Sequence, residues 1–261
     1  MLFLTAIFFG FPVGFALRAI GGGGSIVAVP VLVYALGMAP HRAICVSMFA
    51  IGLTATVGAI EKLRTGEADA TAGWTLALPG MLGASLAATT GKHVSQRWLL
   101  VLFAAVMVFV AARMFIESLP RRKAVAADGS DCGSLASASH WRRIGILFTG
   151  LLIGALSGML GVGAGFMVIP ALMLGGGLPI HRAMATSLQV VAFISISAFA
   201  SHFLAGQRPP LGITALFSIT SVLGSECGAR FGNHLLGLRF QQVVAIAIMA
   251  FAAFILARNL G

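Results

Sequence analysis

A chain of 261 residues in which 59% are hydrophobic and 9% are charged is too apolar for a water-soluble globule of this size. The net charge of +10 does not indicate a nucleic-acid-binding protein, because the basic residues stand singly at the ends of apolar segments. The composition therefore predicts an integral membrane protein. Leu99–Ala112 and Val243–Ala257 are apolar on every face, which favours spanning helices over the alternating strands of a membrane barrel.

Apolar segments recur along the chain, and most approach the roughly 20 residues that a helix needs to cross a bilayer core. The first lacks a basic region before it and a small-residue cleavage site, so we expect it to remain as a helix. The pattern predicts an all-α polytopic membrane protein with four to five segments in each half. They are Leu2–Leu17, Ile26–Met38, Ala43–Ile60, Ala72–Thr90 and Leu99–Ile116, then Ile144–Leu160, Phe166–Leu178, Ala183–Leu204, Gly212–Cys227 and Phe240–Ala257.

Two of these segments, Ile26–Met38 and Phe166–Leu178, are too short to cross a bilayer as ordinary helices, at 13 residues each. Each follows a glycine-rich run and carries a proline at its fifth residue. The pattern favours broken or re-entrant helices near the midplane of the membrane. Paired breaks of this kind are the best pointer to a transport site in an apolar sequence.

The two halves of the chain resemble each other at a constant spacing of 140 residues. We predict a first membrane repeat over residues 1–116, a linker over 117–143 and a second membrane repeat over 144–261. Basic residues are in excess in and beside the linker, which predicts that it is cytoplasmic. The identical pairs are Gly10/Gly150, Gly14/Gly154, Gly21/Gly161, Gly23/Gly163, Pro30/Pro170, Leu32/Leu172, Gly37/Gly177, His41/His181, Arg42/Arg182, Ala43/Ala183 and Ser47/Ser187.

The relative orientation of the halves depends on how many times each one crosses the membrane. If the short segments cross, each half has five crossings, the halves are inverted and both termini lie outside. If the short segments are re-entrant, each half has four crossings and the halves are parallel. The absence of any basic residue before Arg18 favours the inverted arrangement.

The glycine runs are candidate anion sites. Four successive glycines are unfavourable within a helix, at about 1 kcal/mol each relative to alanine. Inside a membrane such a break is tolerated only within protein or beside a water-filled cavity. A glycine run that opens a helix also presents free backbone N–H groups at the positive end of the helix dipole, which suits an anion. The candidate residues are Gly21, Gly22, Gly23, Gly24 and Ser25 in the first run, and Gly161, Gly163 and Gly165 in the second.

Polar residues just after the short segments extend the candidate site. Arg42 and Arg182 offer guanidinium groups suited to oxyanions, and the alternative is that both anchor helix ends at the lipid headgroups. Ser47, Thr186 and Ser187 either line a pathway or pack one helix against another.

Several charged residues lie outside the repeated pattern. Arg18 stands three residues before the first glycine run, so we expect it to face a cavity or a partner and count it as a site candidate. Glu226 is either a proton-coupling carboxylate or, given the i,i+4 spacing, the partner of Arg230. We expect the charges of one loop to be solvated: Glu61, Lys62, Arg64, Glu67 and Asp69.

Metal and cofactor sites are not indicated by the sequence. Cys45, Cys132 and Cys227 lie far apart, without CxxC spacing or a histidine at ligand spacing. We predict packed thiols, no metal, no disulfide framework and no cofactor.

The glycine motifs resemble those of a known family. The pattern Gly-x-x-Gly-x-Gly-x-Gly-x-x-x-x-x-Pro-x-Leu at Gly158–Leu172, followed by Ala-x-x-Thr-Ser-Leu at Ala183–Leu188, is similar to the sulfite exporter TauE/SafE family of membrane permeases. The first half fits in the same order, so the resemblance covers essentially the whole chain. It implies a multi-pass carrier in the bacterial inner membrane for small anions such as sulfite or organosulfonates. Arg18, Ala164 and Cys45 depart from the pattern.

Two other functions remain alternatives to a secondary transporter. An anion channel uses the same backbone groups and cations, and the sequence does not separate it from a carrier. An intramembrane enzyme is the weaker alternative: Ser157, His181, His202 and His234 supply nucleophile and base types, but the repeated features lack a paired base. We therefore predict a non-enzymatic protein with a small anionic substrate and possible proton coupling, in a lipid bilayer. The oligomeric state is not indicated.

Overall fold

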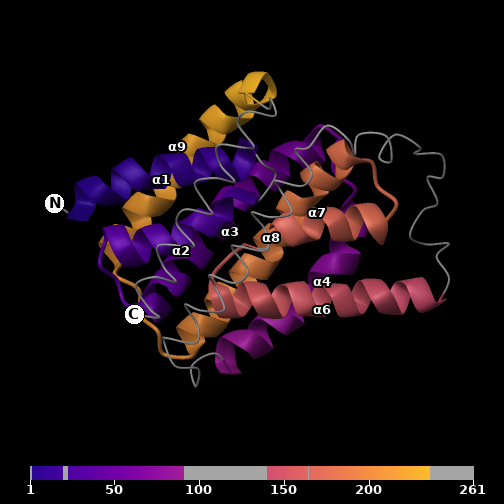
Figure 1. Cartoon of the computed structure of the whole chain (residues 1–261), viewed down its shortest axis with the longest axis horizontal. Coiled ribbons are helices and arrows are strands. Elements are labelled where there is room, and N and C mark those ends of the chain that lie inside the picture. The colour runs from indigo at the N-terminus through magenta and orange to yellow at the C-terminus, as the bar shows by residue number, and fades with distance from the viewer. Residues whose placement is uncertain (1, 20–22, 91–139, 164, 236–261) are drawn as a thin grey trace, which may run out of the picture.

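The computed structural model describes residues 2–19, 23–90, 140–163 and 165–235, and all regular elements in these ranges are helices (Figure 1). Leu99–Ile116, Phe240–Ala257 and residues 117–139 of the linker lie outside the described residues. The elements are α1 (Leu2–Ala19), the 3-10 turn η1 (Gly23–Val27), α2 (Ala28–Pro30), the π-helical turn η2 (Val31–Ala35), α3 (Pro40–Arg64), α4 (Ala70–Thr90), α6 (His140–Leu160), α7 (Gly165–Leu174), α8 (Ile180–Leu204) and α9 (Leu211–Leu235).

The helices that carry the membrane signal differ in how deeply they are buried. Three described helices are long and apolar enough to cross a bilayer: α3, α8 and the Leu211–Arg230 part of α9. The apolar windows of α3 and α8 are 72% and 67% buried, against 44% for α9. Helices α3 and α8 therefore form the centre of the molecule and α9 lies at its periphery.

The outer faces of the peripheral helices are apolar. Leu78, Leu82 and Leu86 are exposed at i,i+4 spacing on α4, and Phe148 and Leu152 are exposed on α6. A contiguous apolar surface of this kind is rare on a protein that faces water. The outer faces of α4 and α6 are therefore suited to contact with lipid tails.

Small residues set the packing of the peripheral helices. Helix α1 packs along α9, and α4 packs along α6. A Cβ atom on Gly14 would overlap the backbone of Ser221, and one on Gly154 would overlap the backbone of Gly80. Close approach through small residues is the usual way in which membrane helices associate, because apolar side chains gain little by leaving lipid for protein.

The contacts between helices also give their directions. Phe11 faces Gly224 and Phe15 faces Gly228, so α1 and α9 run parallel. Helices α4 and α6 run parallel as well, since Gly80 faces Gly154 and Ala84 faces Gly158. The central pair is different: Phe49 stacks on Phe199 and Gly58 contacts Leu188, so α3 and α8 run antiparallel.

Equivalent positions in the two halves adopt the same turns. Gly37 and Gly177 have φ values of 66° and 67°, in the left-handed region that favours glycine. The N–H of Met38 donates to Leu32 O over 3.2 Å, and that of Leu178 donates to Leu172 O over 3.3 Å. The turns after α3 and α8 also match, with Gly66 and Gly206 at positive φ.

The helix boundaries follow local signals. Pro40 occupies the first turn of α3, where its missing N–H is not needed. Asp69 caps α4, because its Oδ1 accepts a hydrogen bond from the N–H of Ala72 over 3.0 Å. Helix α6 begins at His140, so residues 140–143 of the predicted linker are helical.

Candidate functional site

The two glycine-rich breaks meet inside the protein. A Cβ atom on Gly163 would lie 3.3 Å from Ser25 Oγ, 2.7 Å from Ile51 and 3.0 Å from Val191. Gly161, at φ +73°, packs against Val29. The second break therefore contacts the first one, between the central helices α3 and α8.

Side chains bind the backbone carbonyls that the second break leaves without helical partners. Ser157 Oγ donates to Val162 O over 2.6 Å, and Ser47 Oγ lies 2.9 Å from Gly161 O. His202 Nε2 lies 2.9 Å from Gly158 O. Because a carbonyl oxygen only accepts hydrogen bonds, Nε2 carries the proton in this contact.

The backbone N–H groups of the same break are not satisfied in this way. Val162 and Gly163 are both buried, and their N–H groups make no hydrogen bond among the residues that the structure describes. Buried backbone N–H groups without a partner are rare in proteins. Helix α7 begins two residues later, at Gly165, and adds the positive end of its dipole. The break therefore presents donors to its surroundings while its acceptors are occupied.

The first break is described in part. Gly21 and Gly22 lie outside the described residues. Gly23 and Gly24 open the turn η1, and the buried Ser25 follows them. The expected short segments are present as helical pieces, η1 to η2 in the first half and α7 in the second.

The two repeated arginines are not brought to the breaks. Arg42 is exposed in the first turn of α3, and Arg182 is exposed in the first turn of α8. Since α3 and α8 are antiparallel, the two side chains lie at opposite ends of the central pair. These positions fit the alternative in which both arginines are headgroup anchors.

The small hydroxyl residues have separate roles. Ser47 contacts the second break, as described above. Thr186 Oγ1 accepts a hydrogen bond from the N–H of Asp69 over 2.9 Å, which joins α8 to the loop before α4. Ser187 Oγ donates to Met184 O within its own helix. Thr186 and Ser187 are buried, and their hydrogen bonds are structural.

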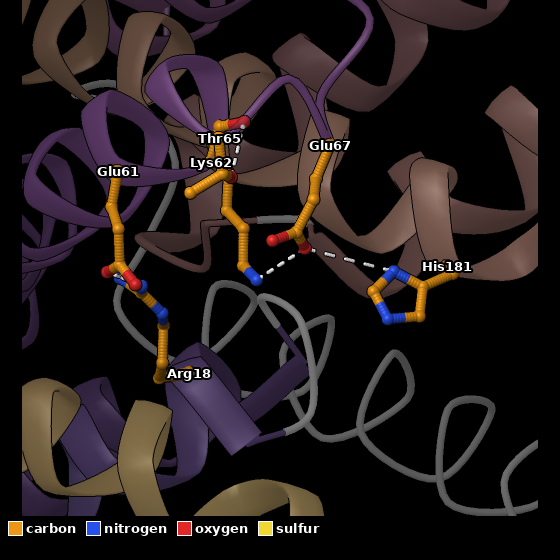
Figure 2. A network of polar contacts seen from close by, with 6 residues as sticks. All are labelled: Arg18, Glu61, Lys62, Thr65, Glu67 and His181. Carbon is orange, nitrogen blue, oxygen red and sulfur yellow. Dashed lines mark hydrogen bonds and ion pairs between the residues drawn. The ribbon is translucent and has the colours of Figure 1, made fainter.

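Arg18 finds its partner in a residue that we expected to be solvated. The Arg18 guanidinium forms an ion pair with Glu61 of α3, and the Arg18 side chain is 3% exposed (Figure 2). The expectation for Asp69 is also wrong, because Asp69 caps α4 and binds Thr186. Local sequence gave no signal for the Arg18–Glu61 pair, whose members are 43 residues apart.

A second group of charges lies beside this pair. Lys62 Nζ lies 2.6 Å from Glu67 Oε2, and His181 Nδ1 lies 4.0 Å from the same oxygen (Figure 2). The hydrogen bond from Lys62, then its charge, and weaker contributions from Thr65 and His181 lower the pKa of Glu67 below its usual value. We call the end of the molecule that holds these residues the network face, defined by Arg18, Glu61, Lys62, Thr65, Glu67 and His181.

Glu226 does not form the ion pair that its spacing favours. It is half-buried on α9, and no ion pair joins it to Arg230 in the part of the chain that the structure describes. The described residues also hold no cluster of three or more metal-ligating side chains.

Comparison with known proteins gives a consistent result. The family model of the sulfite exporter TauE/SafE matches residues 6–255. Two proteins of Xylella fastidiosa named "Probable membrane transporter protein" are 29% (strain Temecula1) and 30% (strain 9a5c) identical to this chain, each over 95% of it and 92% of the relative. "Probable membrane transporter protein YunE" of Bacillus subtilis is 24% identical over 95% of this chain and 93% of the relative. No solved structure matches the chain. The chain therefore belongs to the TauE/SafE family and is a multi-pass membrane transporter of the bacterial inner membrane.

Proposed function

We propose that this transporter is a secondary carrier that exports small anions, with sulfite or an organosulfonate as the substrate, and that it is not an enzyme. The observation that carries the proposal is the polarity of the second break. Ser47, Ser157 and His202 occupy its carbonyl oxygens, which repel an anion. The buried N–H groups of Val162 and Gly163 remain as donors. Successive N–H groups of this kind form anion-binding concavities.

The first break completes the proposed site. Ser25 faces Gly163, so the anion binds where the two breaks meet. Gly21, Gly22, Gly23, Gly24, Gly161 and Gly165 belong to the breaks in this proposal. Glycine at these positions lets backbone approach the substrate closely, which a Cβ atom would prevent.

The proposal includes two homologous halves in an inverted arrangement with broken helices at their centre. The turns that match at a spacing of 140 residues support the repeat. The antiparallel directions of α3 and α8, which are equivalent in the two halves, support the inversion. Each half then has five crossings, and the N-terminus lies outside.

The distribution of basic residues supports this orientation. Lys62, Arg64, Arg182 and Arg230 lie at the network face, where α1, α3 and α9 end and α8 begins. Since α6 runs parallel to α4, Arg142 and Arg143 in its first turns lie at the same end. Arg42 and Arg208 lie at the opposite end. The positive-inside rule therefore makes the network face cytoplasmic.

Export of an anion needs no separate coupling ion. The membrane potential drives a negative charge outward from a negative interior, at about 2.3 kcal/mol per charge per 100 mV. Glu226 is the candidate for proton coupling if efflux at zero potential follows an imposed proton gradient. Glu226→Gln would then abolish that dependence.

Two alternatives predict different behaviour. A channel shows no acceleration of uptake by substrate on the opposite side of the membrane, whereas a carrier does, because loaded exchange returns the site faster than the empty site returns. An enzyme would need Ser157 and His202 as a reactive pair, but each of them binds a backbone carbonyl instead.

The test is counterflow of radiolabelled sulfite, thiosulfate, sulfoacetate, taurine and sulfate in proteoliposomes. We expect exchange of at least one sulfur oxyanion by the wild type and its loss in Gly163→Leu, because the new side chain meets Ile51, Val191 and Ser25. Gly145→Leu is the matched control, since a Cβ atom there meets nothing within 4 Å. Exchange that persists in Gly163→Leu, or the absence of exchange for every anion in the wild type, would contradict the proposal.

A further inference from the structure

The Arg18 guanidinium is only partly satisfied by its ion pair. One of its terminal nitrogens, NH2, binds Glu61. The other, NH1, is buried and has no hydrogen-bond partner among the described residues. A guanidinium offers five N–H donors, and a buried cation is costly unless it is paired and hydrogen-bonded. Arg18 therefore retains capacity for a second oxygen ligand.

The surroundings of NH1 leave room for a ligand on the α3 side. NH1 lies directly over Gly58, at the place that a Cβ atom would take. Leu188 of α8 borders the same position, and Gly228 of α9 lies against the Arg18 Cβ. Three helices besides α1 thus surround the guanidinium, while glycine keeps its nearest neighbour small.

Glu61 differs from Arg18 in its access to solvent. Its side chain is 47% exposed, against 3% for Arg18. The carboxylate therefore reaches the buried cation from the surface. It can leave the guanidinium and regain water without crossing the protein core, so its departure exposes little apolar surface.

Arg18 lies between the network face and the breaks. Gly58, over which NH1 lies, is seven residues from Ile51, which borders Gly163. At 1.5 Å per residue along α3, the guanidinium is roughly 10 Å from the level of the breaks. An anion that enters from the network face meets Arg18 before it meets the N–H groups of the second break.

We infer that Arg18 is an anion-binding position on the route to the breaks, and that Glu61 occupies it as an internal carboxylate until a transported anion displaces it. This inference rests on the proposed function. Carboxylates and sulfur oxyanions present paired oxygens to a guanidinium in the same way. Because one guanidinium compensates one negative charge in apolar surroundings, the position favours monovalent anions, such as a sulfonate or hydrogensulfite, over sulfate.

The first test measures binding of methanesulfonate to the purified protein by titration calorimetry. An occupied site lowers apparent affinity by the fraction of molecules in which it is free, so removal of a carboxylate that occupies it nine times in ten tightens binding about tenfold. We expect this gain in Glu61→Gln and its loss in the double variant Arg18→Gln/Glu61→Gln. Glu67→Gln is the matched control, because it removes the same charge beside Lys62 rather than Arg18. Equal affinity in Glu61→Gln and wild type, or an equal gain in Glu67→Gln, would overturn the inference.

A second measurement uses the wild type alone, in case a variant fails to fold. Carbodiimide with an amine nucleophile labels accessible carboxylates, which mass spectrometry then locates. We expect methanesulfonate to increase the labelling of Glu61 severalfold and to leave Glu67 unchanged, and unchanged labelling of Glu61 would contradict displacement. Counterflow by the wild type separates the two proposals: exchange without a Glu61 effect rejects only the inference, whereas no exchange of any anion rejects the proposed function.

Discussion

The hydrogen bond from Ser157 to the second break gives the sharpest prediction about the site. Ser157 is 1% exposed, and its Oγ donates to Val162 O over 2.6 Å. Ser157→Ala leaves this carbonyl buried without a donor, which costs about 1–3 kcal/mol. Hydrogen bonds in membrane proteins average nearer 0.6 kcal/mol, because lipid-embedded chains find other partners. Since the break is enclosed by α3 and α8, we expect about 1 kcal/mol.

The assay compares thermal unfolding in detergent with counterflow in proteoliposomes. For a chain of this size, 1 kcal/mol lowers Tm by about 2–4 °C. We expect the exposed carbonyl dipole also to raise KM for the anion several-fold. Thr149→Ala is the matched control on the same helix: Thr149 Oγ1 donates over 2.7 Å to Gly145 O at an exposed site, so its loss costs less than about 0.5 kcal/mol. If Ser157→Ala shifts Tm and KM no more than Thr149→Ala does, the argument that the carbonyls must be occupied is wrong.

Two further predictions concern the loops at the two ends of the molecule. Because the pKa of Glu67 is lowered in the folded protein, its ion pair stabilises fully above the usual carboxyl pKa of about 4.3 and is lost as pH falls through the folded value. The Tm difference between wild type and Glu67→Gln should therefore shrink between pH 6 and pH 3.5, and a constant difference would contradict this. In an inverted repeat, His41 and Gln207 are related as His181 and Glu67 are. In a background without native cysteines, cysteine pairs at both sets of positions should crosslink under oxidation, and failure of the His41/Gln207 pair alone would count against the inversion.

Local sequence rules predicted the helical part of the fold well. Helix α8 was expected over Ala183–Leu204 and occupies Ile180–Leu204, while the short second segment appears as α7. The second break lies where glycines interrupt the apolar pattern. These features depend on hydropathy, glycine and proline, whose effects act within a few residues and are therefore visible in the sequence.

Side-chain partners required the tertiary structure. Ser47 binds the carbonyl of Gly161, 114 residues away, and Glu61 binds Arg18 rather than water. Arg42 and Arg182 look equivalent in the sequence, but the antiparallel central helices carry them to opposite ends of the molecule.

The amino-acid sequence alone thus determined that the protein lies in the membrane as helices and where those helices break, because apolarity and backbone freedom are properties of the local chain. Only the tertiary structure decided which charges pair and which donors face the breaks. Those outcomes depend on the directions in which distant helices pack, and a single sequence carries no local signal for them.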